Sequence, residues 1–156
     1  MCHHDEQPHP GLKGAALTAS LRAAELRCLR NEEQLTKPRK RVLQLLLQSD
    51  APMKGYDLIA AFATDGKPTG PPTVYRALEF LGRMGLVHRL ESLNAFVACR
   101  LEDAEHRAAF LICDCCGTTK EFEPSLAAAG DAAKQLGYTL HSITIEAHGR
   151  CAACSA

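Results

Sequence analysis

The fold is decided by residues 71–81, which read Pro-Pro-Thr-Val-Tyr-Arg-Ala-Leu-Glu-Phe-Leu. The apolar side chains recur at the three- and four-residue spacing of an amphipathic helix, and the charged ones fall on the opposite face. The inner face is formed by Val74, Leu78 and Leu81. We therefore predict a helix from Pro72 to Met84, followed by Gly85, the residue type that most often ends a helix.

Short helices precede this segment and a β-hairpin follows it. Apolar periodicity, capping residues and turn residues predict each of them. The first predicted helix covers residues 18–33, the second lies between the N-cap Thr36 and the break at Asp50, and the third covers residues 54–63. The predicted strands cover residues 86–90 and 95–99. This order is typical of a winged helix-turn-helix, in which the last helix enters the major groove of DNA.

The second half of the chain has a different composition and predicts a mixed domain. We expect strands over residues 110–113 and 118–122, a helix over 125–136 and a strand over 138–147. The predicted class is therefore α+β, with an N-terminal winged helix-turn-helix domain and a C-terminal α/β domain. The predicted boundaries are a flexible His-rich tail at 1–17, the winged-helix domain at 18–93, and a metal-binding domain at 94–156.

The net charge of zero hides two unlike halves. The chain has 18 basic and 18 acidic residues. Up to Asn94 there are 13 basic and 10 acidic residues, a charge of +3, and the remainder carries −3. A mildly basic half is compatible with a DNA partner, although the total charge argues against one.

Other features limit the class of protein. No apolar run reaches the 18 or so residues of a membrane span, and the polar N-terminus has no hydrophobic signal core. We therefore expect a cytoplasmic protein with no membrane partner. In that reducing compartment eight cysteines indicate metal or thiol chemistry rather than disulfides.

Two Cys-x-x-Cys pairs predict a structural zinc site. The pairs are Cys113 with Cys116 and Cys151 with Cys154. Each pair can present two thiolates from a tight turn, and two such turns complete a tetrahedral four-thiolate site. The alternative is a thioredoxin-like redox pair, but neither pair is followed by the long helix that would lower a thiol pKa. Cys115 lies inside the first pair, and we leave it out of the ligand set.

A second set of residues has the composition of another zinc site. One thiolate and one carboxylate neutralise Zn²⁺, and two imidazoles complete a tetrahedron. The set is His88, Cys99, His106 and Glu121. Taken singly, each has a simpler interpretation as a surface histidine, a buried thiol or a solvated carboxylate.

Four segments together resemble the ferric uptake regulator family, and most of all its zinc-sensing branch. They are Pro-Pro-Thr-Val-Tyr-Arg-Ala-Leu-Glu-Phe-Leu, Gly-Leu-Val-His-Arg, Phe-Leu-Ile-Cys-Asp-Cys-Cys-Gly and Ile-Glu-Ala-His-Gly-Arg-Cys-Ala-Ala-Cys. The resemblance covers roughly residues 18–156. It implies a metal-activated homodimeric repressor whose C-terminal α/β domain forms the dimer.

The resemblance also assigns residues to roles. It implies that the two Cys-x-x-Cys pairs hold structural zinc and that the second set holds regulatory zinc, two Zn²⁺ per chain. It places Tyr75 and Arg76 in the recognition-helix motif and Tyr56 at a DNA-facing position. Candidate phosphate contacts are Arg39, Lys40, Arg41, Lys54 and Lys67.

One departure from the family bears on the choice of metal. Iron-type members carry a His-His-Asp-His run where this chain has Ala104-Glu105-His106-Arg107, which argues against iron sensing. The hypothesis is a zinc-responsive repressor of zinc-uptake genes that binds an operator as a homodimer, with no enzymatic activity and no small-molecule substrate.

The alternatives are a sibling that senses iron, manganese or nickel, a thiol-based peroxide or redox sensor, and a hydrolytic zinc enzyme. The last needs an open coordination position, whereas both proposed sites are filled by four protein ligands.

Overall fold

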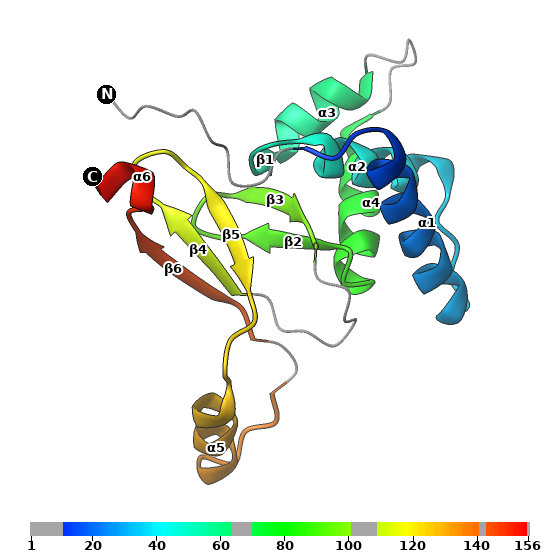
Figure 1. The fold of residues 1–156 in the computed structure, drawn as a ribbon. Coiled ribbons are helices and arrows are strands. Elements are labelled where there is room, and N and C mark those ends of the chain that lie inside the picture. Colours follow the sequence, from blue (N-terminus) through cyan, green and yellow to red (C-terminus); the bar gives the residue numbers. More distant parts are fainter. Residues whose placement is uncertain (1–10, 64–69, 101–108, 141–142, 156) are drawn as a thin grey trace. The chain divides into compact units, whose positions relative to one another are not determined.

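The computed structural model describes residues 11–63, 70–100, 109–140 and 143–155 (Figure 1). They fall into two compact units, one within residues 6–100 and the other within residues 101–156. Helices and sheets occur in both units, as the predicted α+β class requires. The division after Arg100 differs from the boundary predicted at 93/94, which would have separated the two paired strands of the hairpin.

The N-terminal unit is a winged helix-turn-helix. Its sheet has the antiparallel order β1-β3-β2, and β2 with β3 forms the predicted wing. In chain order its elements are α1 (Gly14–Arg30), α2 (Lys37–Gln48), β1 (Met53–Lys54), α3 (Gly55–Ala63), α4 (Pro71–Arg83), β2 (Val87–Leu90) and β3 (Ala95–Ala98). β1 was not predicted, because two residues are too few to show an alternating pattern.

Helix α1 begins inside the segment that we predicted as tail. Leu17 is buried on the core, and the Leu12 N–H donates to the Leu47 carbonyl at 2.8 Å. The chain is therefore attached to α2 before α1 starts. The histidines and the cysteine of the first ten residues lie outside the described part.

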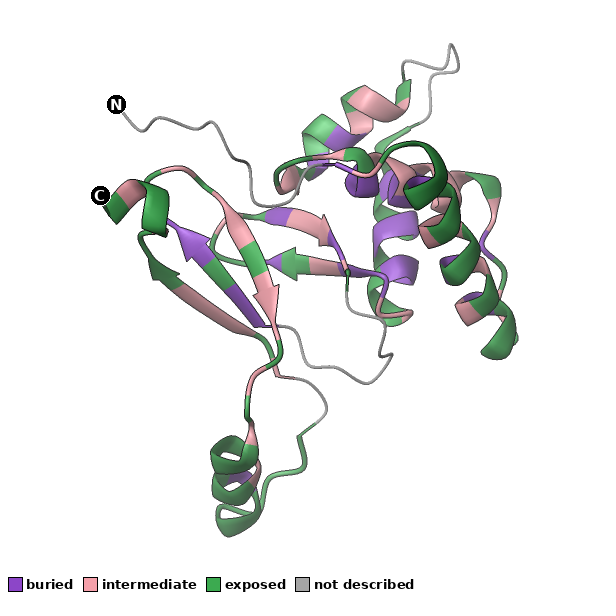
Figure 2. Ribbon diagram, viewed as in Figure 1, coloured by how far each residue is buried: buried purple, intermediate pink, exposed green. Residues whose placement is uncertain are grey.

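The core of this unit lies between α1, α2 and α4 (Figure 2). Its largest fully buried aliphatic residues include Val42, Leu43, Leu58, Val74 and Leu81. The inner face of α4 is the predicted one, and the helix ends as expected. Gly85 has φ +66°, its N–H donates to Gly82, and the Leu86 N–H donates to Leu81, which is a Schellman cap.

The C-terminal unit has a three-stranded sheet with the order β5-β4-β6. β4 pairs antiparallel with β5 and parallel with β6, and α5 lies in the crossover that a parallel pair requires. Its elements are β4 (Ala109–Cys113), β5 (Thr119–Phe122), α5 (Ala127–Gln135), β6 (Ile145–Gly149) and α6 (Ala152–Ser155).

The prediction of a strand over residues 138–147 was wrong in its first half. β6 begins only at Ile145. Gly137 has φ +74°, and the Tyr138 and Leu140 side chains that follow are exposed, so no strand among the described residues covers them. The short helix α6 was also not predicted. Among the described residues no helix has both the length and the apolar character needed to span a membrane.

The core assignment can be tested by a pair of leucine truncations. Leu43 is 2% exposed and Leu29 is 64% exposed. We expect Leu43→Ala to lower the free energy of unfolding by about 2–5 kcal/mol, because it removes buried contacts and leaves a cavity. The matched Leu29→Ala should change it by no more than about 0.5 kcal/mol. Urea unfolding followed by circular dichroism measures both, and equal losses would contradict the assignment.

Candidate metal centres and nucleic-acid interface

The parallel pairing of β4 with β6 brings the two Cys-x-x-Cys pairs together. Cys113 is the last residue of β4 and its register partner is Gly149, two residues before Cys151. The second pair therefore leaves the sheet beside the first. The Sγ atoms of all four cysteines lie within 4.8 Å of one another, and the members are Cys113, Cys116, Cys151 and Cys154.

Tight turns point the thiols of each pair toward a common centre. In the first turn the Gly117 N–H donates to the Cys113 carbonyl at 2.8 Å, and Gly117 adopts the left-handed φ of +71° that the turn needs. The Cys113 N–H donates to Thr118 at 2.9 Å. The second turn closes with a 3.0 Å hydrogen bond from Cys154 to the Cys151 carbonyl at the start of α6.

The spacing of the thiols fits a tetrahedral metal ion. A tetrahedral centre with Zn–S bonds of about 2.3 Å has sulfur atoms about 3.8 Å apart. The Sγ atoms of Cys116 and Cys151, one from each pair, are 3.8 Å apart. Four soft sulfur donors select zinc over hard cations that prefer oxygen ligands. The cluster therefore fits structural zinc and not a magnesium or calcium ion.

Hydrogen bonds prepare part of this cluster as thiolates. The backbone N–H of Cys151 donates to the Cys113 Sγ at 3.3 Å and lowers the pKa of Cys113 to about 6. The Thr118 hydroxyl lies 3.2 Å from the Cys116 Sγ and lowers the pKa of Cys116. Burial beside the other thiols raises the pKa of Cys154 to about 12. A bound cation would displace that proton, since metal ligation requires the thiolate.

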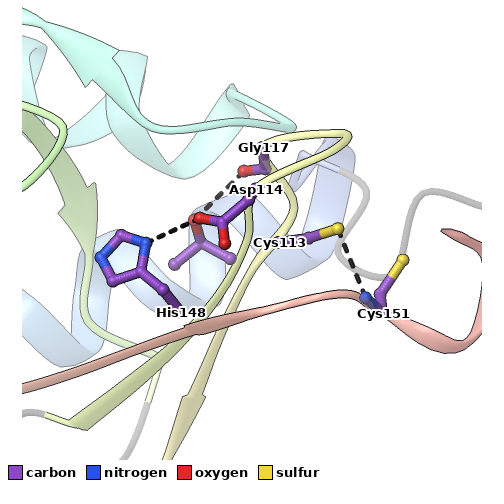
Figure 3. Close-up of polar contacts among 6 residues, drawn as sticks. Cys113, Asp114, Gly117, His148 and Cys151 are labelled. Carbon is purple, nitrogen blue, oxygen red and sulfur yellow. Dashed lines mark hydrogen bonds and ion pairs between the residues drawn. The ribbon is translucent and has the colours of Figure 1, made fainter. Parts of the chain in front are cut away.

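Contacts outside the ligand set attach the first turn to β6. The Asp114 carboxylate pairs with the His148 Nδ1 at 2.9 Å (Figure 3). The Asp114 N–H donates to the Gly149 carbonyl at 2.8 Å. Asp114, His148 and Thr118 were not predicted from the sequence. An Asp within one Cys-x-x-Cys pair and a His just before the other are the only signal that the sequence offers.

The wing carries an imidazole and a thiol that could bind a metal ion together. His88 on β2 opposes Val97 on β3, and Cys99 lies two residues beyond Val97, so His88 and Cys99 share one face of the ribbon. The Cys99 N–H donates to Leu86 at 2.9 Å, which continues the pairing to the end of the wing. The ligand atoms of His88 and Cys99 lie within 4.8 Å of each other, and both residues are half-buried.

The other two predicted members of this set belong to the C-terminal unit. Glu121 lies on β5, opposite Phe110 of β4, and is half-buried. His106 lies outside the described residues. Within the N-terminal unit, the structure thus brings together one imidazole and one thiol of the predicted regulatory set.

Cys28 is a residue of the hydrophobic core. Its side chain is fully buried in the helical core, and this burial raises the pKa of the thiol. A redox-sensing cysteine requires a reactive thiolate within reach of solvent. Cys28 therefore does not fit the thiol-sensor alternative.

The aromatic and cationic residues predicted to face DNA are exposed on α3 and α4. Tyr56 is 65% exposed at the start of α3, Tyr75 is 50% exposed on α4, and Arg76 is exposed one residue later. Gly55 permits a close approach between the two helices. A Cβ atom at Gly55 would lie 2.7 Å from the Tyr75 hydroxyl, so only glycine leaves the Tyr75 ring in this position.

The predicted phosphate contacts differ in their surroundings. Arg39 lies 3.4 Å above the Phe80 ring centre and donates to the Gln34 carbonyl, and Lys40 pairs with Glu25 at 3.3 Å. Both therefore have roles within the unit. Lys54 is exposed, Arg41 is half-buried on α2, and Lys67 lies outside the described residues.

Comparison with known proteins connects both units to one family. The model of the ferric uptake regulator family matches residues 30–148, which includes parts of the winged helix and of the C-terminal sheet. The chain belongs to the ferric uptake regulator family. The resemblance that the sequence motifs indicated is therefore confirmed, and the match includes Cys113 and Cys116.

Individual relatives in this family are zinc regulators. The zinc uptake regulation protein of Escherichia coli is 41% identical over 137 residues, which cover 86% of this chain and 80% of the relative. A solved zinc uptake regulator complexed with zinc and DNA is 38% identical with a TM-score of 0.84, covering 91% of this chain and 97% of its own. The solved holo XcZur is 40% identical with a TM-score of 0.80, covering 88% and 97%.

The four-cysteine cluster of this family member can be tested by zinc content. We expect Cys151→Ser to lose about one zinc per chain after desalting, because a hydroxyl is a poor replacement for a thiolate ligand. Ala153→Ser is the matched control, since Ala153 is exposed between Cys151 and Cys154 and is not in the cluster. Elemental analysis by mass spectrometry measures both variants. Full zinc content in Cys151→Ser would remove Cys151 from the ligand set.

Proposed function

We propose that this protein is a zinc-dependent repressor that binds the operators of zinc-uptake genes as a homodimer. The observation that carries the proposal is the His88–Cys99 pair, because it places a soft metal-binding pair on the wing of the DNA-reading unit itself. The similarity to a zinc uptake regulator in complex with zinc and DNA supports the same conclusion.

Two zinc ions per chain would have different tasks. The four cysteines of the C-terminal cluster hold the first ion and close the end of the β4–β6 sheet. In the second site His106 and Glu121 join the wing pair, which gives two neutral and two anionic ligands and a site without net charge. The thiolate of Cys99 favours zinc over iron or manganese, which prefer harder ligands.

The regulatory ligands come from both units of the chain, and this explains how zinc would control DNA binding. Bound zinc supplies a four-coordinate cross-link. With all four ligands engaged, the winged helix is held in one arrangement, and the dimer presents two recognition helices at the separation of two operator half-sites. Without this restraint the winged helices sample many separations, and fewer of these fit the operator.

Sequence reading would depend on α4. Arg76 is exposed, and its guanidinium can bind guanine O6 and N7 as a bidentate pair, worth about 1–3 kcal/mol of discrimination. Tyr56 and Tyr75 would contact bases or backbone. Lys54 and Lys67 are the preferred phosphate contacts, because Arg39 and Lys40 would first have to leave their partners within the unit.

The regulatory site is tested by removing its thiolate. We expect Cys99→Ser to need at least tenfold more free zinc than the wild type for half-maximal operator binding, since it removes a strong ligand from the site. Zinc is titrated into protein that already holds its structural ion, and operator binding is followed by fluorescence anisotropy. Ala153→Ser, which introduces the same residue type outside the proposed regulatory site, should behave as wild type. If Cys99→Ser binds operator equally well at limiting zinc, the regulatory assignment fails.

The reading helix is tested separately. We expect Arg76→Ala to lose at least about tenfold of the preference for operator over unrelated DNA, because a bidentate base contact disappears. Arg22→Ala on the exposed face of α1 is the matched control and should keep the preference. Zinc content should be unchanged in both variants. Retained preference in Arg76→Ala would exclude this arginine from base reading.

A further inference from the structure

Helix α4 carries a single acidic residue, Glu79, at the centre of its solvent-facing side. Each residue turns an α-helix by about 100°, so Glu79 lies about 40° from Tyr75 and about 60° from Arg76 when viewed along the axis. It therefore projects between these two side chains, one turn further along the helix. The inner face opposite is formed by apolar residues, among them Val74 and Leu81.

Within the described part of the chain, the carboxylate of Glu79 has no partner. Arg83 is its neighbour four residues later, in the order that favours a helical ion pair. Arg83 instead pairs with Glu33 at 3.0 Å and lies 5.4 Å from the Phe80 ring centre. Across the described residues, the side chains of Glu79 and Arg76 have no intramolecular hydrogen bond or ion pair. The outer face of α4 thus presents two unengaged charges of opposite sign.

A carboxylate in this position does not help the protein to attract DNA. Phosphates repel it, and the N-terminal part of the chain up to Asn94 has an excess of only three positive charges to offset that repulsion. The side of a recognition helix that enters the major groove, however, faces base edges, and Glu79 lies on the same side of α4 as Arg76. Among the hydrogen-bond donors exposed in the major groove, the N4 amino group of cytosine is the one from which a carboxylate typically accepts.

We propose that Glu79 is a specificity-determining residue whose carboxylate accepts a hydrogen bond from the N4 amino group of a cytosine in the operator. The cytosine lies close to the guanine read by Arg76, because the two side chains project less than a turn apart. This proposal rests on the proposed function, since it requires α4 to lie in the major groove.

The experiment is selection from a randomised duplex DNA library by zinc-loaded protein. The proteins compared are wild type, Glu79→Gln, Glu79→Ala and the charge-matched control Asp131→Asn, whose side chain is exposed on α5. We expect wild type and Asp131→Asn to select cytosine at one position of each half-site. Both Glu79 variants should lose that preference by about fivefold or more, and Glu79→Gln should shift it toward adenine, the base that an amide recognises.

The outcomes separate this proposal from the proposed function. If the Glu79 variants select the same sequence as wild type and bind every sequence more tightly by one common factor, the carboxylate acts only by repelling phosphates and the proposal is overturned. If wild type with zinc selects no sequence at all, the proposed function itself fails. Zinc content and circular dichroism of each variant confirm that the proteins compared are equally folded.

Discussion

The parallel pairing of β4 with β6 is the constraint on which the C-terminal unit depends. These strands are separated by more than thirty residues of chain, including α5, and their register places Cys113 opposite Gly149. Only this register brings two cysteine pairs so distant in sequence to one point. A metal ion held by the four thiols would in turn restrain both strand ends, which a three-stranded sheet with a largely exposed helix cannot restrain by apolar burial alone.

The wing illustrates a different use of strand geometry. Residues of an antiparallel ribbon alternate between two faces, so the side chains of Val87 and Ala98 pack on the helices while those of His88 and Cys99 share the other face. A shift of one residue in the pairing would bury the imidazole and expose the apolar side chains. The same apolar contacts that stabilise the winged helix therefore also keep the His88 imidazole and the Cys99 thiol side by side.

Much of this arrangement was predictable from the sequence. Physical reasons explain why the rest could not be predicted. α4 was placed to within one residue because apolar periodicity and Gly85 act locally. The start of β6 was not placed correctly. Tyr138 and Leu140 are residue types common in strands, but among the described residues no partner strand covers them. Nor could the sequence indicate that Arg39 stacks on Phe80, since a charge pattern does not show which aromatic ring lies within reach.

The charges on α4 explain how a unit with a small positive net charge can bind DNA selectively. A strongly basic surface would bind any sequence through phosphates and make selection difficult. Here two of the candidate cations, Arg39 and Lys40, have partners inside the unit, and Arg83 pairs with Glu33. Of the two unengaged charges that the described part of α4 presents, Arg76 and Glu79, one is negative. Binding must then draw on base contacts and on the simultaneous engagement of two half-sites, which makes it sensitive to any ligand that sets the distance between the two helices.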